Sequence, residues 1–311
     1  MKNIITVNQV TFTYTSYKKL EGFLGIFKRE KKEIQALRNF SMRLNEGEIL
    51  GLLGLNGAGK TTLIKLLTGI LNPNKGKIEV LETSPFKKEK TFLKQIGVMF
   101  GQKSQLIWDL PPINTLTMLC EIYELSHQEF KERLDFFVKK LNIEEQLYQP
   151  VRKLSLGQRI KFELICSLIH NPKIIFLDEP TIGVDIPSKM SIYDFLLELN
   201  RNSKTTIILT SHDSQDIEVL AKHIVILNNG IKIFDGSKNE LKNKYMRNDQ
   251  LEVTTNREVI DVPKNVIRIG PSKYRLNSDD FDKIGIPSSF IVNIKRVGSD
   301  LNDILMKILS A

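Results

Sequence analysis

One run of eight residues, Gly54 to Thr61, contains the residue types that bind phosphate. It reads Gly-Leu-Asn-Gly-Ala-Gly-Lys-Thr and fits the pattern Gly-x-x-x-x-Gly-Lys-Ser/Thr. The glycines let the backbone curl so that successive N–H groups point inward and bind the oxygens of an anion. In such a loop Lys60 reaches the β- and γ-phosphates of a nucleotide, and the Thr61 hydroxyl coordinates Mg²⁺. The run therefore predicts a binding site for a nucleoside triphosphate.

The flanking residues predict the two elements that must position this loop. Glu48–Leu53 is short and almost entirely apolar, which is typical of a buried strand. Thr62–Leu67 has a helical pattern, and the N-terminus of such a helix adds positive potential to the loop. The alternative interpretation is a glycine-rich turn with an incidental lysine, and it does not account for a strand and a helix on either side.

A second apolar run, Ile174–Asp178, delivers two adjacent carboxylates, Asp178 and Glu179. Open α/β sheets bind their ligands at the carboxyl ends of buried strands, which is where this pair would lie. Asp178 would hold Mg²⁺ directly or through water, and Glu179 would polarise a water that attacks the γ-phosphate. Taken alone, the pair could equally be a solvated turn, and the phosphate loop favours the functional interpretation.

Two more segments place polar residues where a nucleotide could be bound. The predicted strand Thr205–Thr210 ends in Ser211-His212-Asp213, so that His212 could donate a hydrogen bond to the γ-phosphate. Ser155 precedes a long amphipathic pattern, Arg159 to His170, and would begin a helix whose free N–H groups and serine hydroxyl bind an anion. The remaining histidines receive no function: His127, His170 and His223.

In chain order, these motifs resemble those of the ATP-binding subunit of an ABC transporter, over residues 4 to about 245. The resemblance assigns the signature to Leu154–Gln158, Walker B to Ile174–Asp178 and the D-loop to Ile182–Asp185. It makes Glu179 the catalytic carboxylate and His212 the switch histidine. The resemblance makes Lys60 a third catalytic residue. Gln102, in the Q-loop, is implied as a ligand of ATP and, with Thr61 and Asp178, of Mg²⁺. Walker A, Gly54 to Thr62, and the signature supply the other implied ATP contacts: Asn56, Gly57, Ala58, Gly59, Lys60, Thr61, Thr62, Ser155 and Gly157.

The resemblance extends to an adenine-stacking aromatic and to a subgroup. Tyr14 occupies the place of the aromatic residue that stacks on adenine, with Tyr17 as the alternative. The stretch Gly101–Pro111 and the signature look most like the bacterial exporter ATPases related to the daunorubicin and sodium exporters. Their resemblance implies that ATP hydrolysis powers export of an unknown solute.

Two features depart from the family pattern. The first glycine of the signature is replaced by Leu156, which could change how closely a second subunit approaches. The link between the first two strands is expanded into Ser16–Glu33, where apolar residues at helical spacing lie among lysines and arginines: Leu20, Phe23, Leu24 and Phe27. This basic amphipathic pattern suits a membrane surface or the cytoplasmic end of a membrane partner, or else an excursion packed on its own domain. Gly22 and Gly25 weaken the helix prediction.

The predicted fold class is α/β, a P-loop NTPase core of the ABC ATPase type with an inserted helical subdomain. Residues 1–245 would form the ATPase domain, and about 103–170, with helical patterns at Asn114–Leu125 and Gln128–Leu141, the helical subdomain. Trp108, just after the Q-loop, belongs either to the surface facing the membrane partner or to the core. Residues 251–311 would form a small α+β accessory domain of undetermined role.

Composition excludes some classes and leaves others open. The 311 residues contain no apolar run near the roughly 18 residues that a membrane span needs, and the N-terminus lacks the cleavage site of a signal peptide. Cys120 and Cys166 stand alone among apolar neighbours and are expected in the core of a cytosolic protein. The net charge of +9 is compatible with nucleic acid or an anionic membrane but selects neither.

The resemblance also implies partners. Two copies would dock head to tail, most simply as a homodimer, with each ATP between Walker A of one copy and Ser155 and Gly157 of the other. Permease subunits would be separate chains, the subunit would sit peripherally at the cytoplasmic side of the cell membrane, and no nucleic acid partner is expected. The alternative is a soluble ABC-type ATPase that acts on ribosomes or DNA, but the chain has neither a second nucleotide domain nor a long coiled coil. Glu179 and His212 argue against a regulatory module that does not hydrolyse ATP.

Overall fold

The computed structural model describes residues 2–19, 29–101, 103–245, 250–259, 262–263, 266–283, 286–297, 301, 304–305 and 308. Contacts divide the chain into two units, Met1–Gly236 and Ser237–Ala311. The first unit contains the motifs described above. The sequence alone places residues up to 245 with the first unit, and that domain assignment stays a prediction.

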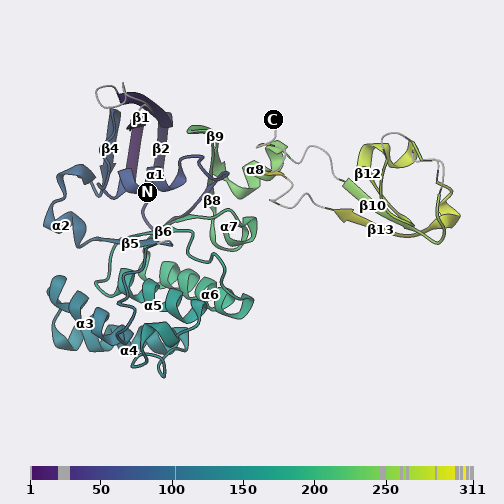
Figure 1. The fold of residues 1–311 in the computed structure, drawn as a ribbon. Coiled ribbons are helices and arrows are strands. Elements are labelled where there is room, and N and C mark those ends of the chain that lie inside the picture. The colour runs from purple at the N-terminus through teal and green to yellow at the C-terminus, as the bar shows by residue number, and fades with distance from the viewer. Residues whose placement is uncertain are drawn as a thin grey trace. The chain divides into compact units, whose positions relative to one another are not determined.

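A six-stranded sheet forms the centre of the first unit, in the order β5-β6-β7-β3-β8-β9 (Figure 1). β5 to β8 in this order run parallel. Parallel strands covered on both faces are expected to be continuously apolar, and β3, β6 and β7 are buried at every position. The strands are β3 (Ile49–Leu53), β5 (Ile96–Phe100), β6 (Ile174–Asp178), β7 (Thr206–Thr210), β8 (His223–Asn228) and β9 (Ile231–Ser237).

A second, antiparallel sheet has the order β2-β1-β4 and consists of β1 (Asn3–Lys19), β2 (Arg29–Asn45) and β4 (Lys75–Val80). The core joins this sheet to the central sheet through α1 (Lys60–Leu67), because Leu63 and Ile64 of α1 pack in one apolar cluster with Phe40 of β2 and Phe176 of β6. The helix that follows the phosphate loop is therefore enclosed by both sheets.

The expanded link Ser16–Glu33 is not helical where the structure describes it. Ser16 pairs with Lys32 and Lys19 with Arg29, so both ends of the predicted amphipathic segment continue β1 and β2 as an antiparallel ladder. Alternating Thr and aromatic residues before Ser16 favour a strand, and each new cross-strand pair extends the established register. The two described ends of the link are therefore strands, and the helix prediction for the segment between them stays a prediction. The four apolar residues on which it depended lie outside the described residues.

Residues 103–170 form three α-helices and no named strand: α3 (Pro112–Ile122), α4 (His127–Leu141) and α5 (Leu156–Leu168). Figure 1 shows them gathered below the central sheet, beside α6 (Ile186–Ser203). α3 begins two residues before its predicted start, because Pro112 is well suited to the first helical position. Shorter elements complete the unit: η2 (Pro85–Lys87), α2 (Lys90–Leu93), η3 (Val151–Lys153) and α7 (Ser214–Leu220).

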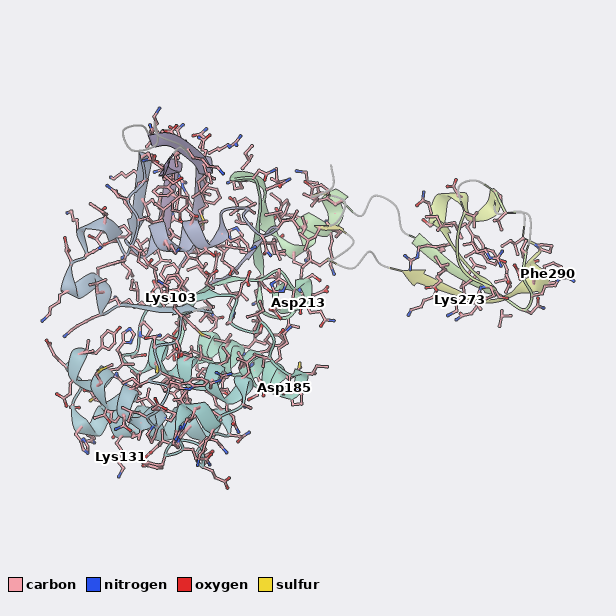
Figure 2. All side chains as sticks on the ribbon, viewed as in Figure 1. Lys103, Lys131, Asp185, Asp213, Lys273 and Phe290 are labelled. Atoms are coloured by element: carbon pink, nitrogen blue, oxygen red, sulfur yellow. The ribbon has the colours of Figure 1, made fainter. Side chains whose placement is uncertain are left out.

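The second unit contains a four-stranded antiparallel sheet in the order β11-β12-β10-β13. Its core is built around Tyr274, which is fully buried and whose hydroxyl donates to the Val259 carbonyl at 3.2 Å and accepts from the Val259 amide at 2.6 Å. Figure 2 shows Lys273 and Phe290 in this unit. Its elements are α8 (Lys238–Tyr245), β10 (Gln250–Thr255), β11 (Ile267–Gly270), β12 (Lys273–Asn277), η4 (Ser278–Lys283), η5 (Ser288–Phe290) and β13 (Ile291–Val297).

No helix among the described residues is long and apolar enough to cross a membrane.

Candidate active site

The phosphate loop has a backbone that only glycine allows at two positions. Gly54 and Gly59 have φ values of 153° and 108°. A Cβ on Gly59 would lie 2.5 Å from the carbonyl oxygen of Ala36 in β2, and one on Gly54 would lie 2.4 Å from that of Leu227 in β8. Both sheets therefore contact the loop closely, and the loop can curl between β3 and α1 because Gly54 and Gly59 have no side chains.

Lys60 is the first residue of α1 and is 5% exposed. Its Nζ donates to the carbonyl oxygens of Gly54 at 2.6 Å and Leu55 at 3.3 Å, so the side chain folds back across its own loop. Burial lowers its pKa, and the negative charges of Glu179 and Asp178 oppose that shift. A phosphate oxygen in the loop would compete with these carbonyls for the ammonium protons.

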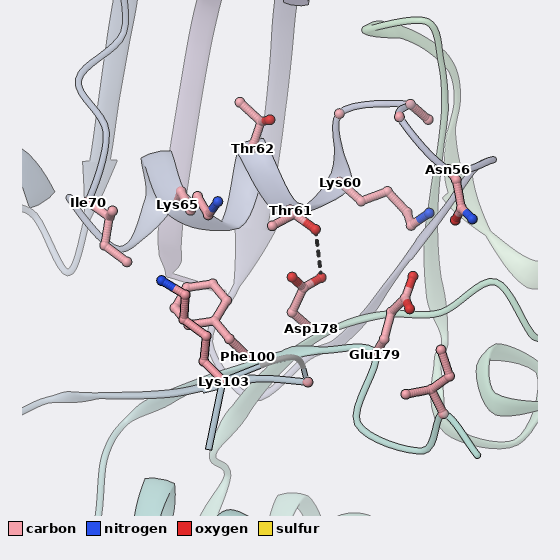
Figure 3. A pocket seen from close by; sticks show the side chains of 15 residues that line it. Asn56, Lys60, Thr61, Thr62, Lys65, Ile70, Phe100, Lys103, Asp178 and Glu179 are labelled. Carbon is pink, nitrogen blue, oxygen red and sulfur yellow. Dashed lines mark hydrogen bonds between the residues drawn. The ribbon is translucent and has the colours of Figure 1, made fainter. Parts of the chain in front are cut away.

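Asp178 ends β6 and accepts hydrogen bonds from two threonine hydroxyls. Thr61 Oγ1 donates to Asp178 Oδ1 at 3.1 Å, as the dashed line in Figure 3 marks, and Thr210 Oγ1 donates to the same oxygen at 2.7 Å. The carboxylate is 8% exposed. Its hydroxyl partners come from α1 and from the end of β7, so Asp178 joins the phosphate loop to the neighbouring strand.

Glu179 follows at once, with a backbone conformation that is unusual for its residue type. Its φ is 55°, which lies in the left-handed region. Its backbone N–H donates to two oxygens of Thr210, the carbonyl oxygen at 3.2 Å and Oγ1 at 3.0 Å. A non-glycine residue held there carries strain, which gathers at functional sites. Figure 3 shows the side chains of Asp178 and Glu179 both turned toward the phosphate loop.

These groups line one cavity of about 630 Å³ (Figure 3). Most of the sequence-predicted phosphate and metal residues lie here: Asn56, Gly57, Ala58, Gly59, Lys60, Thr61, Thr62, Asp178 and Glu179. The lining also includes residues that the sequence analysis missed: Lys65, Ile70, Phe100, Gly101, Lys103 and Ile182. For Lys65 a signal existed, because it stands four positions after Thr61 on a predicted helix and so shares its face.

Five predicted residues lie outside this lining: Tyr14, Gln102, Ser155, Gly157 and His212. Tyr14 is partly exposed, and its hydroxyl is 3.2 Å from Oγ1 of Thr62, which does line the cavity. His212 lines a separate cavity of about 120 Å³ together with Glu179, and its Nδ1 is 3.7 Å from Glu179 Oε2. Gln102 lies outside the described residues, while both its neighbours in sequence line the phosphate-loop cavity.

Comparison with known proteins gives the family of this site. A family model described as "ABC transporter" matches residues 37–182. The ABC transporter ATP-binding protein NatA of Bacillus subtilis (strain 168) is 32% identical over 215 residues, which cover 69% of this chain and 87% of that protein. The chain belongs to the ABC transporter ATP-binding proteins. It is an ATPase subunit of this family, and the family and fold predicted from the sequence are confirmed.

Two further relatives are named for different roles, drug resistance and zinc uptake. The daunorubicin resistance ATP-binding protein DrrA3 of Streptomyces coeruleorubidus is 26% identical over 279 residues, covering 88% of this chain and 87% of that protein. The zinc uptake system ATP-binding protein ZurA of Listeria monocytogenes serovar 1/2a is 30% identical over 261 residues, covering 81% of this chain and 93% of that protein. Because the first unit ends at Gly236, the similarity to DrrA3 extends into the C-terminal unit.

A solved structure gives the same fold. The ATP-binding cassette MJ0796, in a dimeric post-hydrolysis state bound to ADP and Pi, superposes with a TM-score of 0.64 at 24% identity, covering 75% of this chain and 98% of that chain. The two-sheet and helical architecture of the first unit is therefore that of an ABC ATPase.

The ABC signature of this chain lies on other elements than Walker A. Ser155 is the N-cap of α5, and its Oγ accepts from the Gln158 N–H at 3.2 Å while the Gln158 side chain accepts from the Ser155 N–H at 2.9 Å. A Cβ on Gly157 would lie 2.4 Å from Ser188 Oγ of α6. Ser155 and Gly157 are absent from the described lining of either cavity above.

The D-loop lies directly against this signature. Leu156, which replaces the usual glycine, has its Cδ2 within 3.2 Å of the position of a Cβ on Gly183. Gly183 itself has a φ of 71°, a conformation that favours glycine, and an added Cβ would press on the end of the Leu156 side chain. Asp185 then caps α6 by accepting from the Ser188 N–H at 2.9 Å (Figure 2).

Thr210 is a site residue that the sequence analysis missed. Its hydroxyl donates to Asp178 and accepts from the Glu179 N–H, so it fixes both carboxyl-bearing residues. The available signal was a polar residue at the end of an apolar strand, at the same edge of the sheet where the Walker B strand ends. That signal does not say which partner the hydroxyl meets.

Proposed function

We propose that this ATPase subunit works as a head-to-tail pair and that hydrolysis of ATP drives export of a solute through separate permease subunits at the cytoplasmic face of the membrane. The observation that carries the proposal is the cavity in which the phosphate loop faces Asp178 and Glu179, while Ser155 lies elsewhere. One copy supplies the phosphate loop and the carboxylates, and a second copy supplies the signature serine.

In this proposal Lys60 and His212 stabilise the charge that develops on the γ-phosphate, and Glu179 accepts a proton from water. The water oxygen forms a bond to phosphorus as the bond from phosphorus to the leaving oxygen of ADP breaks, and ADP and phosphate are released. His212 and Glu179 already lie within 3.7 Å of each other. Inorganic phosphate and ADP leave when the two copies separate.

The donor set beside the phosphate loop fits Mg²⁺. Thr61 Oγ1 and Asp178 Oδ1 are hard oxygen donors that approach within 3.1 Å, and such donors, with phosphate oxygens, are the usual ligands of this ion. Thr61 and Asp178 would hold it, with Gln102 as the third predicted ligand. When bound, Mg²⁺ supplies neutralisation of the negative charge on the phosphates.

Tyr14 would stack on adenine, because its hydroxyl reaches Thr62 at the start of α1 and the ring stands beside Phe12 in an edge-to-face pair. The nucleotide would then extend from the second sheet to the phosphate loop. Asn56, Gly57, Ala58, Gly59 and Thr62 would complete its phosphate contacts.

An exposed apolar surface supports docking of a membrane partner. It lies on α3 and the loop before it, and each of its side chains is at least 40% exposed: Ile107, Trp108, Leu110, Met118 and Ile122. Trp108 is therefore a surface residue and not part of the core, and the Arg159 guanidinium lies 5.2 Å from its ring centre. A short apolar cytoplasmic segment of a permease would fit such a surface.

Export is proposed from the subgroup resemblance of residues 101–111 and the signature, and the similarity to a drug-resistance protein supports it. The similarity to a zinc uptake protein supports the opposite direction. Growth of cells that lack this protein distinguishes export from uptake. Hypersensitivity to cytotoxic compounds supports export, whereas growth failure only when a required metal is scarce supports uptake.

The paired site is tested by the mass of the Glu179→Gln protein with and without Mg-ATP, measured by light scattering after gel filtration. Loss of the carboxylate with phosphate binding intact should trap the dimer, so that ATP doubles the mass. Adding Ser155→Arg should abolish the shift. The matched control, Ser126→Arg, changes the equivalent cap of α4 and should leave the shift intact. A mass that ignores ATP would contradict the self-sufficient paired site.

A further inference from the structure

A buried carboxylate, Asp216, accepts hydrogen bonds from three separate segments of the ATPase unit. It lies in α7 and is 2% exposed. Its Oδ2 accepts from Thr181 Oγ1 at 2.5 Å and from Ser211 Oγ at 2.7 Å. Its Oδ1 accepts from the Tyr193 hydroxyl and lies 2.8 Å from Lys189 Nζ. None of these side chains has a part in the proposed function.

The four donors keep this carboxylate charged. Burial by itself raises the pKa of Asp216, but the hydrogen bonds that it accepts outweigh burial, so its pKa lies below the ordinary value. Burial and the same negative charge raise the pKa of Tyr193. A buried charge with all its hydrogen bonds satisfied holds its partners in one arrangement.

Two of the donors stand at the start of loops that face the site. Thr181 directly precedes the D-loop, and its carbonyl accepts from the Val184 N–H at 3.2 Å. Ser211 directly precedes His212. Both hydroxyls donate to the same oxygen of Asp216, so one atom sets the spacing between the two loops.

The residue after His212 is held by the same cluster. The Asp213 N–H donates to Ser211 Oγ at 2.9 Å, and its carboxylate pairs with Lys189 Nζ at 2.5 Å (Figure 2 shows Asp213). Both neighbours of His212 are therefore fixed to α6 and α7. The histidine side chain is left to turn toward Glu179, at 3.7 Å.

We propose that Asp216 is a positioning residue for ATP hydrolysis, which ties the D-loop to the segment that carries His212. The inference rests on the proposed function and assigns to the paired site a route of control. When a second copy displaces the D-loop, the displacement passes through Thr181 to Asp216 and from Asp216 through Ser211 to His212. His212 then approaches the γ-phosphate only when the D-loop is in its docked position.

The test removes, one at a time, the two hydrogen bonds that Asp216 Oδ2 accepts, in the full chain and with Asp216 itself unchanged. Thr181→Val and Ser211→Ala each remove one donor to Asp216 Oδ2. We expect kcat for ATP to fall by about one order of magnitude in each, because small misplacements of catalytic groups are costly, while KM and nucleotide affinity change less than about twofold. Thr181→Ser keeps the hydroxyl and should restore kcat.

A matched control loses a buried threonine hydroxyl far from the site. Thr206 is fully buried at the start of β7, and its Oγ1 accepts from the Gly47 N–H at 2.9 Å. Thr206→Val should lower the melting temperature about as much as Thr181→Val while kcat stays unchanged. The double variant Thr181→Val/Ser211→Ala should lose less than the product of the two single losses, since both act through one carboxylate.

Either of two outcomes overturns the inference. One is unchanged kcat in Thr181→Val and Ser211→Ala, and the other is a fall in kcat that Thr206→Val reproduces at equal loss of stability. Failure of the paired site itself is distinguishable, because then Glu179→Gln shows no ATP-dependent mass shift whatever happens at Thr181.

Discussion

Two helix starts in this molecule are proposed to bind the same phosphates, and they are built in opposite ways. α1 begins at Gly59, where no side chain caps the helix, so its first N–H groups are offered to a ligand. α5 is capped by Ser155, whose hydroxyl accepts the Gln158 N–H while the Gln158 side chain accepts the Ser155 N–H. Walker A thus presents backbone donors, and the signature presents a capped helix.

The difference shows what each half of the site can contribute. Ser155 Oγ accepts the Gln158 N–H, so its own hydroxyl proton is left to donate outward to an anion. The uncapped start of α1, in contrast, needs an acceptor such as a phosphate oxygen for its free N–H groups, and Lys60, which donates to the Gly54 carbonyl, cannot supply one. A pre-capped helix can dock as a rigid body onto a loop that already holds nucleotide.

The largest expected effect comes from the uncapped side. Lys60→Ala removes the charge beside the γ-phosphate, and we expect ATP turnover to fall by about 10³-fold. Lys65→Ala removes a lysine from the same helix and cavity but one turn further on, and turnover should fall less than about tenfold. Equal losses in steady-state assays would show that only the general positive charge of the cavity matters.

The capped side should respond more weakly and in two separable ways. Ser155→Ala removes both the cap and the outward hydroxyl, so we expect about 1 kcal/mol less stability and an ATP turnover about 10²-fold lower. Ser126→Ala removes the same capping box from α4, where Glu129 replaces Gln158, and should lower stability equally without changing turnover. Chemical denaturation and ATPase assays on both variants check this. If Ser126→Ala lowered turnover as much as Ser155→Ala, the only role of Ser155 would be to cap its helix.

The end of the signature helix should give the molecule an acid sensitivity. His170 follows α5, stacks on Tyr123 with ring centres 3.8 Å apart, and donates from Nε2 to the Ile96 carbonyl at 2.9 Å. Burial lowers its pKa from 6.5 to about 4. The unfolded chain therefore binds a proton that the folded chain does not bind. The free energy of unfolding falls as pH drops from 6.5 toward 4, by about 1.5 kcal/mol between pH 6.5 and 5.

His170→Phe keeps a ring for the stack and does not titrate. Its unfolding free energy should be lower at pH 7 but should depend less on pH between 6.5 and 5, as measured by denaturant titration at several pH values. Hydrogen exchange at pH 5 should show faster opening in α5 than in α1 of the original protein. If the unfolding free energies of the original protein and of His170→Phe fell equally with pH, His170 would be excluded as the cause of the acid sensitivity.

The smallest expected effect concerns adenine. Tyr14→Ala should weaken ATP binding by about five- to tenfold, the loss of one aromatic stack worth about 1 kcal/mol. Tyr14→Phe keeps the ring and loses only the contact with Thr62, so its affinity should stay within about twofold. Fluorescence titration with an ATP analogue distinguishes these results, and an unchanged affinity in Tyr14→Ala would place the adenine elsewhere.

Local patterns were enough to predict most elements near the site. The apolar runs before Gly54 and Asp178 form β3 and β6, because a strand buried on both faces needs apolar residues throughout. The extension of β1 and β2 was missed, because cross-strand pairing between Ser16 and Lys32 is a contact between distant residues.

The sequence by itself determined the chemistry: a glycine-rich loop with Lys60, a strand ending in Asp178 and Glu179, and a serine that begins a helix. These are properties of neighbours in the chain, where backbone freedom and side-chain type act directly. Only the tertiary structure decided that Thr210 bonds to the Asp178 carboxylate and to the Glu179 backbone. It also decided that Asp216 accepts from Thr181, just before the D-loop, and from Ser211, just before His212. Those partners come from different strands and helices, and hydrogen bonds between them exist only after the sheet has set the distances.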